Sequence, residues 1–88
     1  MKPSDQELLE FLERILNDED EYLCCILYAT LTSEQELEGN KKNQESSLSI
    51  SKFIIDNLDK MNIESKGRKT FIREYFGKIP EIVAQYQK

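Results

Sequence analysis

The stretch ELLEFLERIL, residues 7–16, decides the fold class of this chain. Its apolar side chains recur at helical spacing and form one stripe on a helix of about three turns, with charged side chains opposite. The stripe consists of Leu8, Leu9, Phe11, Leu12, Ile15 and Leu16. Ser4 and Glu7 have the spacing of a capping box, which predicts the start of the helix near Ser4. Asn17 is predicted to end it.

The next segment contains an apolar run over residues 22–29 that shows no clear period. It fits either a buried strand or a helix that is buried nearly all round. We favour a helix, because a single strand would have no partner. The four carboxylates of residues 18–21 are expected to form its first turn, at the positive end of the helix dipole. The helix either continues to Gly39 or breaks near Thr32, since residues 33–36 form a second capping box.

The polar stretch GNKKNQESS, residues 39–47, is predicted to be the one long loop of the chain. Ser46 or Ser47 is then expected to cap a third helix, which carries an apolar stripe of its own and ends near Asn62. The members of this stripe are Ile50, Ile54, Leu58 and Met61, with Phe53 beside it.

A last helical segment begins at Ser65 or Lys66 and keeps helical spacing to the end of the chain. We expect Pro80 to break it and to start a short terminal helix, because proline removes a backbone donor and crowds the preceding turn. A kinked continuous helix is the alternative. With 88 residues, the chain fits one domain, residues 1–88. The predicted fold is all-α, a small four- or five-helix up-and-down bundle.

Charge is divided unevenly along the chain. Residues 1–38 carry eleven acidic and two basic side chains, a net −9, whereas residues 39–88 carry ten basic and six acidic side chains, a net +4. The whole chain is therefore at −5. Because long-range fields steer molecular encounters, a dipolar small protein is predisposed to meet charged partners.

The acidic candidate site is the run Asp18, Glu19, Asp20 and Glu21. It lacks the alternating ligands and central glycine of a calcium-binding EF-hand loop, so we predict no metal there. One interpretation is a solvated helix start. The other is an acidic face that binds a basic protein, since opposite potentials raise association rates.

The alternative, anion-binding candidate consists of Lys66, Arg68, Lys69 and Arg73. Cations at a helix N-terminus oppose the helix dipole, so the stability of that helix does not explain them. Nucleic-acid binding is one interpretation, but the acidic net charge of the chain argues against it. A further interpretation, which we prefer, is that this segment pairs with the acidic half of the same chain or of a second copy.

Several kinds of chemistry are excluded by the residue types. The chain contains no histidine, which removes histidine-based acid–base catalysis, histidine-assisted nucleophiles and histidine-containing zinc sites. It also has no glycine-rich phosphate-binding motif. We therefore predict that the protein is not an enzyme and uses no cofactor.

Cys24 and Cys25 are adjacent, so a disulfide between them would require a distorted backbone. We expect free thiols in the core, a redox-sensing pair being the alternative. Free thiols favour a reducing compartment, and we predict a cytoplasmic protein. The longest apolar run has only eight residues, far short of a membrane span, and the start of the chain has no apolar signal core.

The succession of amphipathic helices, a polar middle loop, a basic second half and an aromatic-rich late helix resembles the small immunity proteins that protect bacteria from their own bacteriocins. The segment SKGRKTFIREYFGKIPEIV, residues 65–83, carries most of this resemblance. The resemblance concerns the pattern of helices, and we transfer no site residue from it. It implies a helical bundle that binds another protein.

We therefore predict a small non-catalytic protein of inhibitor, immunity or adaptor type, which binds a basic protein through a charged helical surface. One alternative is a nucleic-acid-binding regulator that uses residues 66–73. The other is a self-associating structural subunit, because leucine, isoleucine and tyrosine in the second helix exceed what one small core can hide.

Overall fold

The structure is a computed structural model that describes residues 3–87, and within this range all regular structure is helical. The all-α prediction is confirmed. Four helices have eleven residues or more, and shorter helical segments connect or end them. The elements are α1 (Pro3–Leu16), α2 (Tyr22–Thr32), α3 (Glu34–Leu37), α4 (Lys41–Asn57), the 3-10 turn η1 (Leu58–Lys60), α5 (Lys66–Phe76) and α6 (Ile79–Ala84).

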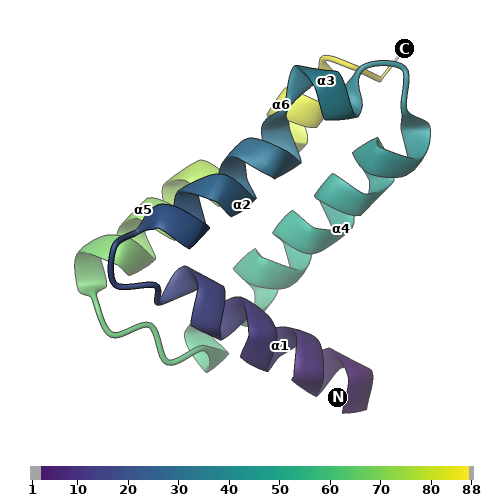
Figure 1. The fold of residues 1–88 in the computed structure, drawn as a ribbon. Helices are drawn as coiled ribbons and strands as arrows, with labels where there is room; N and C mark the ends of the chain where they lie inside the picture. The colour runs from purple at the N-terminus through teal and green to yellow at the C-terminus, as the bar shows by residue number, and fades with distance from the viewer. Residues whose placement is uncertain (1–2, 88) are drawn as a thin grey trace.

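The helices form a bundle whose members alternate in direction. Figure 1 shows α2 with α3, then α4, and then α5 with α6 running alongside one another, each antiparallel to the one before it. Helix α1 crosses one end of this arrangement and packs against α2 and against α4 near the end where α4 finishes. The connection between α1 and α2 therefore lies at the same end of the molecule as the beginning of α5.

A single core joins all the long helices. It is formed by apolar side chains that are almost completely withdrawn from water, and each of these burials contributes roughly 1.5–3 kcal/mol of favourable transfer free energy. The core residues are Leu9, Leu12, Leu16, Cys24, Leu31, Leu37, Ile54, Leu58, Met61, Ile72, Phe76, Ile79 and Val83. Tyr28 extends this core, because its ring packs edge-on against Phe76 and Tyr75.

The stripe of residues 8–16 is only partly buried. Leu9, Leu12 and Leu16 belong to the core, whereas Leu8 and Phe11 are exposed. Helix α1 begins at Pro3, so Ser4 lies inside the helix and the predicted N-cap at this residue is wrong. The helix ends after Leu16, immediately before the predicted terminator.

The predicted start of the second helix is wrong. Residues 18–21 precede α2, whose first residue is Tyr22, and they form a non-helical connection in place of the first turn of the helix. The reason is the backbone of Glu21, which has a φ of 62° and therefore lies in the left-handed region. Of the two alternatives for this segment, a helix that continues to Gly39 and a helix that breaks near Thr32, the structure shows the second, since α2 ends at Thr32 and α3 follows with Ser33 between them. Ser33 makes no side-chain capping hydrogen bond.

The predicted loop over residues 39–47 is also wrong, because α4 begins at Lys41. Gly39 has a φ of +68° and turns the chain, and the side chain of Asn40 accepts a hydrogen bond from the backbone N–H of Asn43 at 3.0 Å. The polar residues that follow are helical. Ser47 is buried within the helix, so neither it nor Ser46 is a cap.

The second half otherwise follows the prediction closely. Helix α4 ends at Asn57, earlier than the expected Asn62, and η1 carries the chain onward while Leu58 and Met61 stay buried. The predicted start of the last segment is confirmed, since Ser65 caps α5 by accepting a hydrogen bond from the N–H of Arg68 at 3.1 Å.

The predicted break in this segment is confirmed as well, because α5 ends at Phe76 and Pro80 stands in the first turn of α6. Gly77 lies between these helices. A Cβ atom at this position would stand 2.5 Å from the carbonyl oxygen of Arg73, so only glycine fits here without a shift of the backbone.

Candidate functional site

The acidic turn, defined as Asp18, Glu19, Asp20 and Glu21, connects α1 to α2, and its first residue binds the backbone at the start of α2. The carboxylate of Asp18 accepts a hydrogen bond from the backbone N–H of Leu23 at 3.1 Å, which satisfies one of the free donors at the start of α2. Glu19 and Asp20 are exposed, and neither forms a side-chain hydrogen bond or ion pair with another described residue. Two of the four carboxylates are therefore free to meet a partner.

The basic segment, defined as residues 66–73, begins beside the acidic turn. Arg68 reaches across to the end of α1, where its Nη1 donates a hydrogen bond to the carbonyl oxygen of Leu16 at 2.7 Å. Its Nη2 lies 3.7 Å from a carboxylate oxygen of Glu21. Because the C-terminal end of a helix carries partial negative charge, Arg68 stabilises α1 at the point where that helix ends.

This position makes Arg68 a structural residue. Its side chain is only 9% exposed, and its Nε is buried without a hydrogen-bond partner in the described part of the chain. The expectation that the basic segment pairs with the acidic half of the same chain is met at this residue. Arg68 is unfavourable for the dipole of α5, at whose N-terminal end it stands, but favourable for the dipole of α1, whose C-terminal end it contacts.

The other cations of the basic segment are mostly paired within the second half of the chain. Lys69 lies 3.0 Å and Arg73 3.3 Å from the same carboxylate oxygen of Asp59. The pKa of Asp59 is lowered below its usual value, chiefly by the hydrogen bond from Lys69 and then by the positive charge of the same residue. Lys66 alone is exposed and has no ion pair among residues 3–87. The alternative anion-binding residues therefore do not form one free cationic surface.

The outer face of α2 is apolar and open to water. Tyr22 is 66% exposed, Leu23 43% and Ile26 42%, and the thiol of Cys25 lies on the exposed side as well. None of the eleven residues of α2 is charged. Single apolar residues on a surface are ordinary, but several on one helix next to an acidic turn form a combination that suits a protein partner.

The two cysteines are free, but one is buried and the other is exposed, so only half of the prediction for them is correct. Cys24 belongs to the core, where burial raises the pKa of its thiol to about 11. Cys25 is exposed, which contradicts the expectation of two core thiols. Cys25 is therefore the accessible and more reactive thiol of the pair.

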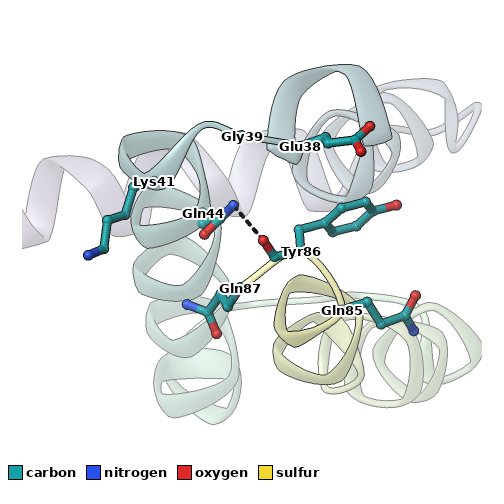
Figure 2. A pocket seen from close by; sticks show the side chains of 7 residues that line it. All are labelled: Glu38, Gly39, Lys41, Gln44, Gln85, Tyr86 and Gln87. Atoms are coloured by element: carbon teal, nitrogen blue, oxygen red, sulfur yellow. Dashed lines mark hydrogen bonds between the residues drawn. The ribbon is translucent and has the colours of Figure 1, made fainter.

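A cleft lined mostly by polar residues, which sequence reasoning missed, lies at the end of the molecule that is opposite to the acidic turn. Figure 2 shows Gln44 of α4 pointing toward the C-terminal segment, where its Nε2 donates to the carbonyl oxygen of Tyr86 at 3.2 Å. The same nitrogen donates to the carbonyl oxygen of Leu37 at 2.8 Å. The cleft is lined by Glu38, Gly39, Lys41, Gln44, Gln85, Tyr86 and Gln87. The buried amide of Gln44 therefore connects α4 to the end of α3 and to the segment that follows α6.

The described residues contain no group of three cysteine, aspartate or glutamate side chains that could hold a metal ion. Within residues 3–87, no helix has both the length and the apolar character required to cross a membrane. No protein-family model, no curated protein and no solved structure matches the chain significantly.

Proposed function

We propose that this protein is a small non-catalytic binding protein of inhibitor, immunity or adaptor type. Its partner is a basic protein, and the binding surface is the outer face of α2 together with the acidic turn. The observation that carries the proposal is the direct succession of free carboxylates and exposed apolar side chains, from Glu19 to Ile26. Apolar contacts supply affinity, and the carboxylates supply orientation and a fast encounter.

The backbone of the acidic turn supports the proposal. Glu21 has a φ of 62°, a conformation that costs a residue with a side chain roughly 1–2 kcal/mol and glycine nearly nothing. A glutamate therefore stands where glycine would give a more stable turn. Strained positions of this kind are concentrated at functional sites.

Nucleic-acid binding through the basic segment receives less support. Arg68 is buried against α1, while Lys69 and Arg73 share the carboxylate of Asp59. A phosphate group would have to compete with these existing partners. The acidic net charge of −5 would in addition repel the nucleic-acid backbone.

Self-association is the second candidate function, because the exposed apolar residues of α2 favour any partner that covers them. Leu8 and Phe11 of α1 add further exposed apolar surface. The acidic turn works against this candidate, since two copies that bring their acidic turns together repel each other.

Differential capture tests the proposal. Wild-type protein, a Glu19→Lys/Asp20→Lys variant and a matched Glu45→Lys/Glu81→Lys control are immobilised and exposed to a lysate of the producing organism. The control makes the same change in net charge at exposed carboxylates of α4 and α6. We expect one basic protein to be retained by wild type and control and lost by the first variant. Once purified, this protein should lose about tenfold or more in affinity for that variant at low salt.

Two results would overturn the proposal. The first is equal retention of every captured protein by the two double variants. The second is binding of DNA or RNA by the intact protein that weakens steeply with salt, since this would assign the function to the basic segment.

A further inference from the structure

Acidic residues stand at both ends of α2. The acidic turn precedes Tyr22, and Glu34, Glu36 and Glu38 follow Thr32 in and beside α3. The eleven residues between them carry no charge. At 1.5 Å per residue, these two acidic groups are separated by about 16 Å along the helix. Figure 1 shows that α3 lies beyond the far end of α2, so the two acidic groups lie at opposite ends of α2.

The second acidic group also has free members. The amide of Asn43 donates to the carbonyl and to the carboxylate of Glu36, at 2.8 Å and 3.3 Å, and thereby holds this residue against α4. Glu34 and Glu38 are exposed and form no side-chain hydrogen bond or ion pair with the rest of the described chain. Each end of α2 thus presents two unpaired carboxylates.

A second copy of the chain is a poor occupant of this surface. If two α2 helices lay alongside each other in the same direction, acidic turn would meet acidic turn. In the opposite direction, each acidic turn would meet the glutamates of α3. Both arrangements bring like charges together at both ends, which opposes association. An anionic membrane surface is disfavoured for the same reason.

The helical nature of α2 also limits the shape of its partner. Away from its two ends, its backbone N–H and C=O groups are bonded within the helix, so the face offers side chains and no strand edge. Such a face packs most effectively against another helix, whose side chains fit between its ridges.

From these observations we infer that α2 docks a helical segment of the partner protein that is apolar on one face for about three turns and carries basic residues at both ends. The inference rests on the proposed function and specifies the partner element. Its apolar side chains cover Tyr22, Leu23 and Ile26, while its two basic ends meet the acidic turn and the glutamates of α3.

Designed peptides test the spacing of charge. The first is an amphipathic helix of about 18 residues with a leucine stripe in the middle and lysines at both ends. The second has the same composition with all lysines at one end, and the third has glutamates in place of the lysines. We expect the first to bind about tenfold more tightly than the second, and the third not to bind. Binding is measured by calorimetry and by slower alkylation of Cys25.

Variants of the protein locate the peptide. Glu19→Lys/Asp20→Lys and Glu34→Lys/Glu38→Lys should each weaken the first peptide by about tenfold, because each removes one of the two charged contacts. Ile26→Ser should weaken it by a similar factor through the apolar contact, while leaving the circular dichroism spectrum and the urea midpoint close to those of wild type.

The outcomes separate this inference from the proposed function. If the two lysine peptides bind equally, or if neither binds while the captured host protein still distinguishes Glu19→Lys/Asp20→Lys from its control, the inference is wrong and the proposed function stands. If the captured proteins also fail to distinguish the variants, both are wrong. A dimer that dissociates in Ile26→Ser, or binding to anionic lipid vesicles that this substitution abolishes, would assign the face to another occupant and overturn the inference.

Discussion

The acidic turn and the basic segment look alike in the sequence, since each is a short run of like charges, but the structure uses them in opposite ways. The cations of the basic segment are mostly paired within the chain. Arg68 binds the carbonyl at the end of α1, and Lys69 and Arg73 both pair with Asp59. The acidic turn leaves Glu19 and Asp20 without partners among the described residues. A run of charge therefore identifies a binding surface only when its members remain unpaired in the fold.

The largest effect is expected at Arg68. The substitution Arg68→Glu places a negative charge beside the carbonyl of Leu16 and the carboxylate of Glu21, in a position that is nearly closed to water. We expect it to lower the free energy of unfolding by about 3 kcal/mol or more. Urea denaturation followed by circular dichroism measures this loss.

Lys69→Glu is the matched control, since it reverses a neighbouring charge that is more exposed. Its loss should be several times smaller. Equal losses would mean that the two regions do not differ as described. They would also show that charge reversal anywhere in the basic segment destabilises the protein to a similar extent, and that the buried position of Arg68 has no special effect.

The next effect compares the two sides of α2. Leu31 belongs to the core and Ile26 to the outer face. Leu31→Ala should lower the free energy of unfolding by about 3 kcal/mol, because a cavity remains. Ile26→Ser should lower it by less than about 1 kcal/mol, because this side chain is already partly in water. Urea denaturation of both variants measures the difference, and similar losses would indicate that Ile26 is required for folding and is not reserved for a partner.

A smaller effect of opposite sign is expected in the acidic turn. Glu21→Gly should raise the free energy of unfolding by about 1 kcal/mol, because glycine adopts the left-handed conformation without strain. The lost contact with Arg68 costs little, since Glu21 is largely exposed. Thermal denaturation measures the gain.

Glu21→Ala distinguishes strain from charge repulsion. Alanine also removes the carboxylate, but it meets the same steric strain at a positive φ. A gain with alanine as large as that with glycine would show that crowded negative charge, and not the backbone, destabilises the turn.

Much of the fold could be predicted from helical spacing alone. The helix over residues 8–16 and the break at Pro80 follow from local rules of periodicity and backbone geometry, and the structure confirms both. The helix over residues 22–32 required a choice between strand and helix, which the absence of a pairing partner decided correctly.

The errors occurred where tertiary contacts override local preference. Residues 39–47 look like a loop because they are polar, yet Gln44 and Ser47 are buried, and the amide of Gln44 donates to the nearby carbonyl of Leu37 and to the distant carbonyl of Tyr86. Asp18–Glu21 look like a helix start, yet the left-handed backbone at Glu21 keeps them outside the helix. Neither long-range hydrogen bonds nor a positive φ at a glutamate is visible in a single sequence.

The residues of the candidate site could be named from the sequence, but which of their charges are unpaired could not. The sequence identifies both charged runs and the excess of apolar residues in the second helix. Which charges are free depends on Asp59 and on the carbonyl oxygen of Leu16, which lies 52 residues before Arg68. Neither residue carries a sequence signal for this role. This part of the site required the structure.

The smallest effect is expected at Asp59, the residue that pairs Lys69 and Arg73. The carboxylate is largely exposed, so Asp59→Asn should lower stability only slightly, and added salt should remove the difference from wild type. Because the folded protein lowers the pKa of Asp59, its contribution is present above the ordinary carboxyl pKa of 3.8 and is lost as the pH falls through the lower folded value. The two urea midpoints should therefore differ at neutral pH and low salt and converge in acid. A difference that persists in acid or in high salt would mean that Asp59 stabilises the protein by a route other than its ion pairs. Lys69 and Arg73 would then be less firmly paired with Asp59 than their distances indicate.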